Sequence, residues 1–377
     1  MGNATEVLEQ LRAYTNDVMK FHGLKLTDTG KNSHGAFAEN QPSGFIYHYT
    51  ASPRSKTKKR PYGRSPVLLE RFKPGSKQRV GVQFIIMDDP YPRLKEIKDK
   101  YPLIRDIPAE VYFMGGDEAY WHAGSANRWA WGVEIRNVGQ VQQDTSGNFF
   151  YNRGKYRWRG RAPIHVGSDH WEPYTRSQMI GAVWILRLAA ELHPLIPERV
   201  LGHTHVSNTR IDPGLHFPIH SMREFGLWER DIPLEDMPFL SEFGDDSGED
   251  VEDVLVSEEE LHAGLYRHDW DGDAGTERIE AVFDFTEEEV EDIRSDDPDH
   301  AEVVKAKEDL RSIGYYVGTA DGTMSKSFIE TLRIFQGRWK VKKGKRWVHD
   351  PKIPVNGRLT EETKSRITMM VRQVDRM

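Results

Sequence analysis

The chain of 377 residues contains no cysteine. Disulfide bonds, thiolate metal ligands and cysteine nucleophiles are therefore excluded, and zinc fingers are disfavoured. Long apolar runs are also missing, because the longest, Met179–Leu186, is much too short to span a bilayer. The first twenty residues are interrupted by charges and have no apolar centre, so we expect neither a secretory signal nor membrane insertion. We therefore expect the protein to be made in the cytoplasm and to reach any target outside it by another route.

The net charge of −7 is distributed very unevenly. Residues 241–300 carry 24 acidic side chains and 3 arginines, a local charge of −21, whereas the remaining residues hold 35 acids and 49 bases, a charge of +14. An acidic connector between two basic parts suits a polyanionic target such as cell wall, and the charge pattern alone leaves nucleic acid open.

The first part of the chain has the pattern of an α/β domain over residues 1–238, with a helical extension at its start. Thr175–Gln178 has the form of a capping box and predicts a helix that ends near His193, before Pro194. Short apolar runs bounded by turn residues predict strands at 44–48, 80–87, 111–114 and 131–135.

Residues 239–300 are dominated by like charge and predict a linker, in part disordered, that can include a small folded element. Within it, Asp269, Asp271, Asp273 and Glu280 occupy positions 1, 3, 5 and 12 of a calcium-binding loop. The glycine expected at position 6 is missing, since Ala274 stands there, and acid-rich linkers produce this spacing by chance. Ca²⁺ binding at 269–280 is therefore the weaker interpretation.

From residue 301 to 377 the pattern predicts a small all-α domain of three helices. Gly314 ends the first helix, while Ser325 and Thr360 are caps for the second and third. A segment rich in Lys, Arg and Trp, residues 339–349, separates the second and third helices.

The most informative stretch is 202–214, where His203 precedes Asp212 by nine residues. Imidazole and carboxylate groups are zinc ligands, and a catalytic zinc takes three protein ligands and leaves one position for water. His48, at the end of an apolar run, is the candidate for the third ligand. Further histidines near the stretch are rivals for these roles: His205, His216 and His220.

Four motifs in order resemble the type 2 N-acetylmuramoyl-L-alanine amidases, whose zinc fold is shared with peptidoglycan recognition proteins and many phage endolysins. They are 47–50 (Tyr-His-Tyr-Thr), 121–124 (Trp-His-Ala-Gly), 131–134 (Trp-Gly-Val-Glu), and Gly202-His203 with Asp212-Pro213-Gly214. The tail similarly resembles the peptidoglycan-binding three-helix domain, through residues 310–314, 321–322, 331–336 and 357–360. The resemblance implies a mixed central sheet flanked by helices, followed by the all-α module.

The resemblance also implies roles for single residues. His48, His203 and Asp212 would hold one Zn²⁺, Glu134 would be the general base, and Arg210 would stand where the family usually has lysine. Strand alternation places Glu134 opposite Trp131 and Val133, but does not decide whether its face lines the site. Substrate contacts are implied for three further residues: Trp121, His122 and Asn127.

The implied activity is zinc-dependent hydrolysis of the amide between N-acetylmuramic acid and L-alanine, with peptidoglycan as partner, no nucleic acid, and a monomer as the expected state. A bacteriolytic, endolysin-like role fits the expected absence of an export signal, because the protein would then reach the cell wall by another route, such as phage lysis or as part of a virion. Two alternatives remain: a non-catalytic peptidoglycan-recognition protein, and a zinc hydrolase acting on a peptide crosslink.

Overall fold

The computed structural model describes most of the chain outside the acidic segment. The described residues are 3–24, 33–51, 65–72, 81–88, 92–115, 118–120, 122–151, 156–157, 162–166, 169–214, 216–243, 287–295, 299–344 and 346–375. The candidate calcium loop at 269–280 lies outside these ranges, as does Trp121. Within them, no helix combines the length and the apolar character that crossing a membrane requires.

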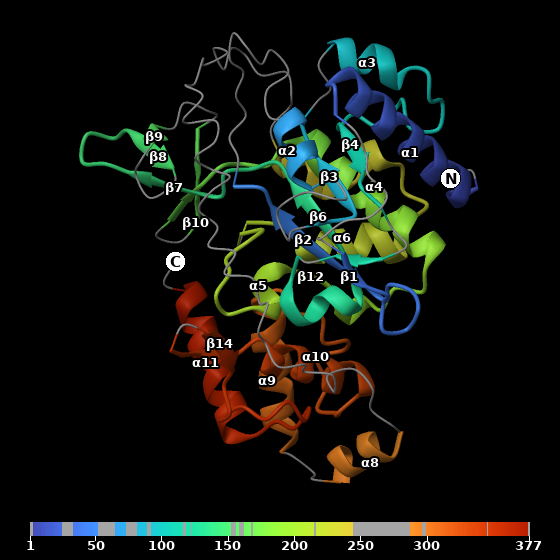
Figure 1. Ribbon diagram of the computed structural model, residues 1–377. Helices are drawn as coiled ribbons and strands as arrows, with labels where there is room; N and C mark the ends of the chain where they lie inside the picture. Colours follow the sequence, from blue (N-terminus) through green and yellow to red (C-terminus); the bar gives the residue numbers. More distant parts are fainter. Residues whose placement is uncertain are drawn as a thin grey trace.

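A five-stranded mixed sheet forms the centre of the first part of the chain (Figure 1). Four neighbouring strands run parallel and the last is antiparallel, so the predicted mixed α/β architecture is confirmed. In spatial order the strands are β12 (Val200–Gly202), β2 (Gly44–Tyr49), β6 (Ala130–Ile135), β3 (Phe84–Ile86) and β4 (Val111–Phe113). The strands predicted from short apolar runs all occur, and β12 joins them from much later in the sequence.

One face of this sheet is covered by α4 (Arg176–Leu192), and α1 (Ala4–Phe21) packs on β4 and α4. The predicted capping box is present, because Thr175 accepts from the backbone N–H of Gln178 and the Gln178 side chain accepts in return. Side chains at alternate strand positions fill the space beneath α4, as period-two alternation requires. They include Phe45, Tyr47, Phe84, Trp131 and Val133.

A second five-stranded sheet, which the sequence patterns did not reveal, projects from the body of the first part (Figure 1). Its order is β10 (Ile164–Val166), β11 (Asp169–Trp171), β7 (Gln140–Gln143), β8 (Phe149–Tyr151) and β9 (Tyr156–Arg157). Its strands are two to four residues long, which is too short for a clear hydrophobic alternation. The shorter elements of this part are β1 (Ser33–Gly35), α2 (Ser65–Phe72), α3 (Pro92–Lys98), β5 (Ala119–Tyr120), the 3₁₀ turns η1 (Gly124–Arg128), η2 (Pro197–Arg199), η4 (Leu234–Asp236) and η5 (Pro238–Glu242), α5 (His203–Val206), α6 (Ile219–Arg223) and the π-helical turn η3 (Glu224–Trp228).

The tail contains three main helices, α9 (His300–Ser312), α10 (Lys326–Gly337) and α11 (Glu361–Asp375). A hairpin of β13 (Lys340–Lys343) and β14 (Arg346–His349) occupies the basic segment between the last two helices. A further helix, α8 (Glu287–Ser295), lies at the end of the acidic segment and buries Val290 and Ile293 against the tail. We call residues 299–375 the helical module; the division at 238 and 301 stays a prediction.

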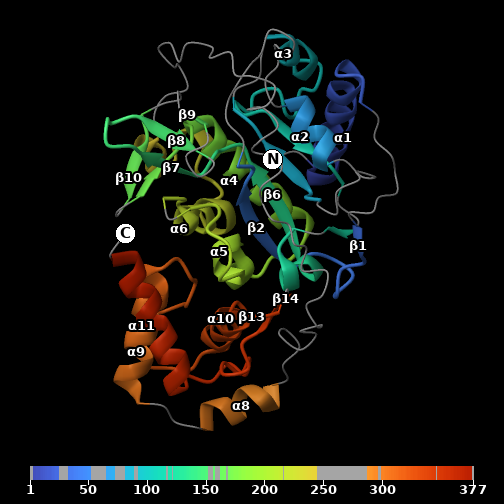
Figure 2. The same cartoon turned by 60° about the vertical axis from the view of Figure 1, so that its left-hand side comes forward.

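The helical module and one face of the sheet share a hydrophobic core, which is separate from the core beneath α4. Ile46, Ala130 and Leu201 belong to the face of the sheet opposite α4, and they cluster with module residues such as Leu310, Leu332 and Phe335. Figure 2 shows the module lying directly beneath α5 and β2. At the edge of this contact, Arg199 pairs with Glu330 at 2.9 Å, and both side chains are buried. Unfolding the module therefore exposes apolar surface of the sheet.

We predict that the full chain unfolds in a single calorimetric transition. Leu332→Ala removes buried methyl groups from the shared core and should lower the free energy of unfolding by about 2–5 kcal/mol. Lys305→Ala, on an exposed face of α9, is the control and should change it by less than about 0.5 kcal/mol. Two separate transitions, with Leu332→Ala shifting one of them alone, would contradict the shared core.

Candidate metal centre

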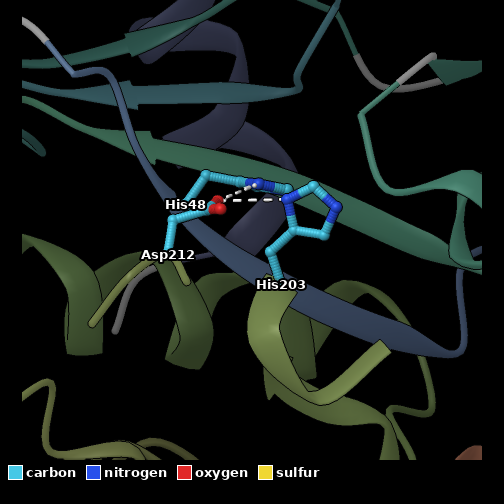
Figure 3. Close-up of side chains that lie close together, drawn as sticks. All are labelled: His48, His203 and Asp212. Carbon is cyan, nitrogen blue, oxygen red and sulfur yellow. Dashed lines mark hydrogen bonds and ion pairs between the residues drawn. The ribbon is translucent and has the colours of Figure 1, made fainter. Parts of the chain in front are cut away.

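Three residues predicted as metal ligands meet at the carboxyl ends of neighbouring parallel strands. His48 is the next-to-last residue of β2, and His203 follows directly after β12 as the first residue of α5. Asp212 lies in the loop beyond α5 and returns to the same place (Figure 3). Ligand sites in α/β sheets occur at this edge because successive parallel strands all present their carboxyl ends there.

The side chains of the three residues converge on one point. The Asp212 Oδ2 atom lies 2.9 Å from Nδ1 of His48 and 3.1 Å from Nδ1 of His203 (Figure 3). One donor atom from each residue lies within 4.8 Å of the others, and all three residues are buried. Two imidazole nitrogens and a carboxylate oxygen at this spacing form the donor set of a zinc or similar divalent site.

The protonation of these groups prepares them to bind a cation. Burial, reinforced by the neighbouring charge of His203, lowers the pKa of His48 to about 4, so its imidazole is neutral at pH 7. Burial alone would raise the pKa of Asp212, but His203 and His48 hold it well below its usual value. A neutral imidazole and an ionised carboxylate are the states in which both groups act as ligands.

A hydrogen-bonded histidine pair indicates which nitrogen of His48 carries the ring proton. The carbonyl of Ala130 accepts from Nε2–H of His122 at 3.1 Å, which leaves Nδ1 of His122 as an acceptor. That atom lies 3.1 Å from Nε2 of His48, so the ring proton of His48 is donated there. Nδ1 of His48 then faces the Asp212 carboxylate as a lone pair.

Two lone-pair acceptors 2.9 Å apart repel each other unless a cation lies between them. The residues present therefore fit a bound metal ion, and His122 acts as the hydrogen-bonded support that metal-ligating histidines usually have. His122 is itself held by Asn127, whose Oδ1 accepts from the backbone N–H groups of His122 and Ala123 at 2.8 and 2.6 Å. The buried positions of His122 and Asn127 favour a positioning role over the substrate contact predicted for them, which stays a prediction.

The backbone around Asp212 is fixed from two sides. Its carbonyl accepts from the N–H of Thr204 at 2.8 Å, and the next carbonyl, that of Pro213, accepts from the Tyr174 hydroxyl at 2.7 Å. Gly202 lies so close that an added Cβ would stand 2.5 Å from the Pro213 ring. The glycine thus permits the Asp212 loop to lie against the end of β12.

Glu134 lies on the same face of the sheet as His48, which the sequence left undecided. Within the parallel pair β2·β6, His48 is the direct register partner of Glu134, and paired residues of parallel strands point to the same side. Glu134 is buried, and its charge acts on Tyr49 and Tyr174 beside the centre.

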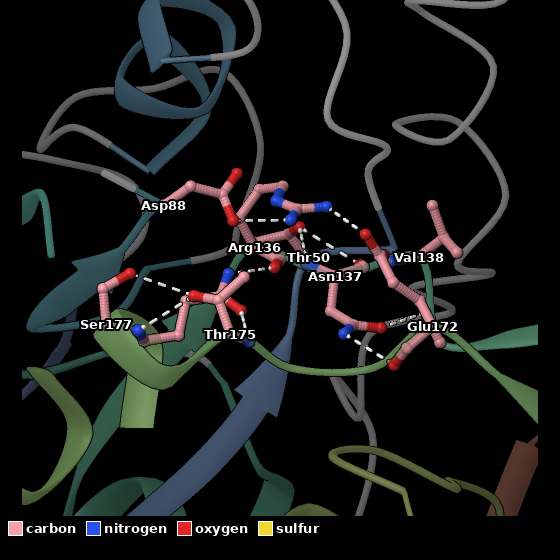
Figure 4. A network of polar contacts seen from close by, with 10 residues as sticks. Thr50, Asp88, Arg136, Asn137, Val138, Glu172, Thr175 and Ser177 are labelled. Atoms are coloured by element: carbon pink, nitrogen blue, oxygen red, sulfur yellow. Dashed lines mark hydrogen bonds and ion pairs between the residues drawn. The ribbon is translucent and has the colours of Figure 1, made fainter. Parts of the chain in front are cut away.

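A buried polar network anchors the end of β6 just beyond Glu134 (Figure 4). Arg136 binds Asp88 at 2.6 Å and Glu172 at 2.5 Å, and the other oxygen of Glu172 accepts from the N–H of Val138. The side chain of Gln178 donates to the Arg136 carbonyl at 2.6 Å, which links the network to the start of α4. Buried charges paired in this way hold the end of the strand next to Glu134 in place.

Comparison with known proteins identifies the part of the chain that holds the centre. Residues 38–215 match the family described as N-acetylmuramoyl-L-alanine amidase. This segment belongs to that amidase family. A search of curated proteins returned no match.

Similar solved structures include an AmpDH3 from Pseudomonas aeruginosa in complex with an anhydromuramic pentapeptide, at 16% identity, covering 91% of this chain and 95% of that chain with a TM-score of 0.30. Another is the N-acetylmuramyl-L-alanine amidase AmiD from E. coli, at 14% identity, with 92% and 93% covered and a TM-score of 0.31. At such TM-scores these similarities contribute nothing to the assignment, which rests on the family match.

The structure also describes Arg210 and the histidines that were rivals for the metal-ligand roles. Arg210 is partly exposed, and its charge acts on His48 and Tyr49. Of the rival histidines, none joins the donor set: His205 and His220 bind backbone carbonyls of the helical module, at Ile313 and Arg311. His216 stacks on Tyr174 with ring centroids 5.0 Å apart.

Gly132 is a residue of the centre that the sequence analysis did not single out. A Cβ atom there would stand 2.8 Å from the ring of His122. The motif Trp-Gly-Val-Glu could have indicated this role, because a glycine two residues before Glu134 lies on the same face of the strand. Its role became visible only once the fold had placed His122 over it.

Gly132→Ala should push His122 away from His48 and weaken zinc binding by about 10-fold, the usual effect of losing a hydrogen bond to a metal-ligating histidine. The measurement is competition with a chromophoric chelator. Gly147→Ala is the glycine control, since a Cβ there meets nothing closer than 3.8 Å, although its positive φ makes a small loss of stability expected. Equal zinc affinity in Gly132→Ala and wild type would argue against the supporting role of His122.

The metal-free amidase should lose stability as the pH falls from 6.5 towards 4. Burial lowers the pKa of His48 and His216 to about 4 and that of His205 to about 3. On unfolding, each returns to about 6.5 and takes up a proton in this window, so stability is fully present above it and decreases below it, by at most about 1.4 kcal/mol per pH unit for each histidine.

Urea unfolding at pH 7, 6 and 5 with chelator present measures this slope. His216→Gln, outside the donor set, should flatten it by up to one proton. A free energy of unfolding that does not change between pH 7 and 5 would contradict the expectation.

Proposed function

We propose that this protein hydrolyses the amide bond between N-acetylmuramic acid and L-alanine in peptidoglycan, with Zn²⁺ held by His48, His203 and Asp212. The observation that carries the proposal is the convergence of these three donors at one edge of the sheet, inside the segment that belongs to the amidase family. Bound zinc supplies a Lewis acid and lowers the pKa of water to about 7.

Glu134 is the group that accepts the proton of the attacking water and passes it to the departing amine of L-alanine. Its register pairing with His48, which puts the two side chains on one face of adjacent strands, supports this role. The network around Arg136 holds its strand end, so that the carboxylate is positioned before substrate arrives.

Arg210 supplies a fixed positive charge at the edge of the centre. As the tetrahedral species forms, negative charge develops on the former carbonyl oxygen, and a cation aimed there contributes about 3 kcal/mol in comparable sites. The guanidinium of Arg210 presents a planar fork of donors, unlike the compact ammonium of a lysine.

The helical module would hold the enzyme on its insoluble substrate and raise the local concentration of the scissile bond. Trp121, His122 and Asn127 remain proposed substrate-contacting residues, and the monomeric, endolysin-like bacteriolytic role remains proposed as well. A non-catalytic recognition protein is disfavoured because all three donors and Glu134 are present together. Nothing specific favours hydrolysis of a peptide crosslink.

Two variants test the chemistry. Asp212→Ala should bind no zinc and release no product from purified sacculi, because one donor is lost. Glu134→Gln should retain zinc but lose at least about 100-fold in kcat, since the general base is removed. Mass analysis of the products should show peptides with a free N-terminal alanine and intact glycan strands.

Glu224→Gln, which alters an exposed glutamate, is the matched control and should behave as wild type. Activity that survives in Asp212→Ala or after chelation would overturn the zinc mechanism. New reducing sugar ends would indicate a glycosidase, and new amines elsewhere in the stem peptide would indicate a crosslink hydrolase.

A further inference from the structure

The helical module is hydrogen-bonded to the stretch that carries two of the three proposed metal ligands. We call residues 203–212 the ligand segment, since His203 begins it and Asp212 ends it. Only its first four residues are helical, so regular secondary structure does not fix the rest. Five hydrogen bonds join His205 and Asn208 of this segment to the module.

His205 connects the metal centre to the module through both ring nitrogens. The N–H of Gly202, the residue before His203, donates to Nδ1 of His205 at 3.0 Å. The neutral imidazole then carries its single proton on Nε2, which donates to the carbonyl of Ile313 at 3.1 Å. The Tyr315 hydroxyl donates in turn to the carbonyl of His205 at 2.8 Å. Module atoms thus hold both the side chain and the backbone of a residue two positions from a ligand.

The module packs tightly against the His205 ring. Gly314, between the two module residues that bind His205, has a φ of +96°, and a Cβ there would lie 2.6 Å from Nε2 of His205. Arg223 closes the other side, because its guanidinium donates to the carbonyls of both Val200 and Gly314. Arg223 thus joins the start of β12 to the module.

Asn208 joins the middle of the ligand segment to the module through three hydrogen bonds with backbone groups of Arg338 and Lys340. Its side chain donates to the Lys340 carbonyl at 3.0 Å and accepts from the Lys340 N–H at 3.1 Å, while its backbone N–H donates to the Arg338 carbonyl at 3.2 Å. These bonds constrain the turn midway between His203 and Asp212. The turn has to keep its shape for the two donors to remain 3.1 Å apart.

We infer that the helical module is a positioning element of the metal centre, acting through His205 and Asn208, in addition to any role in holding the wall. The inference rests on the proposed function. It assigns Asn208 and Tyr315 as positioning residues, and it makes metal affinity and turnover of small soluble muramyl peptides depend on the module. A module that only attached the enzyme to the wall would change neither the metal affinity nor the turnover of a soluble muramyl peptide, because neither depends on attachment to the wall.

The test uses the full chain with Asn208→Ala and, as the milder change, Tyr315→Phe. We expect Asn208→Ala to bind Zn²⁺ about 10-fold more weakly than wild type, and Tyr315→Phe a few-fold more weakly, as substitutions behind metal ligands usually do. The visible absorption of the Co²⁺-substituted proteins should change in band position or intensity, which a merely structural role would leave unaltered. With zinc saturating, kcat for a soluble muramyl peptide should fall while KM stays nearly constant.

Glu330→Gln is the matched control, since it removes an ion pair of the same interface that does not touch the ligand segment. It should lower thermal stability and leave zinc affinity and the Co²⁺ spectrum as in wild type. Wild-type affinity and spectrum in Asn208→Ala would overturn the inference, and so would an equal loss in Glu330→Gln, because docking strength alone would then set the affinity. A wild-type chain that binds no zinc and releases no alanine-terminated peptide would instead overturn the proposed function itself.

Discussion

The Asp212 carboxylate, buried between two imidazoles, is the interaction on which the arrangement of the amidase segment depends. An ionised carboxylate in a low-dielectric environment is very unfavourable unless charge or hydrogen bonds compensate it. Both neighbouring histidines present Nδ1, and the ring proton of His48 is already donated towards His122. His203 and His48 compensate the carboxylate, as the lowered pKa of Asp212 shows, and a cation between the three donors would add to this compensation. The fold also holds the backbone at this group, through Thr204 at the Asp212 carbonyl and Tyr174 at the Pro213 carbonyl.

Three kinds of contact hold the residues around the centre in place. Close packing on Gly132 fixes the ring of His122, and paired charges around Arg136 fix the strand end beyond Glu134. Hydrogen bonds to another part of the chain fix the loop between His203 and Asp212. Catalytic groups need positions accurate to a fraction of an ångström, which strands and buried networks provide better than free loops.

Residue type and spacing indicated the donors, and the family resemblance chose His203 over the rival histidines near it. His203 and Asp212 are nine residues apart, and His48 ends an apolar strand, so residue type and spacing indicated the centre. The main strands and α4 were predictable for the same reason, since alternation and a capping box are short-range patterns. The orientation of His122 was not, because it depends on the register of β2 with β6. The second sheet was missed because its strands are too short to show a hydrophobic alternation. The docking of the helical module was missed because its contacts join residues far apart in the chain.

The common core of sheet and module has a consequence for how such a protein can be recombined. Catalytic and anchoring units joined by a free linker can be exchanged between proteins, since neither recognises the surface of the other. Here a foreign anchor grafted in place of residues 299–375 would leave Ile46 and Leu201 facing solvent and His205 without its acceptor. Exchange of this module would therefore require a graft that also reproduces the surface around Gly314.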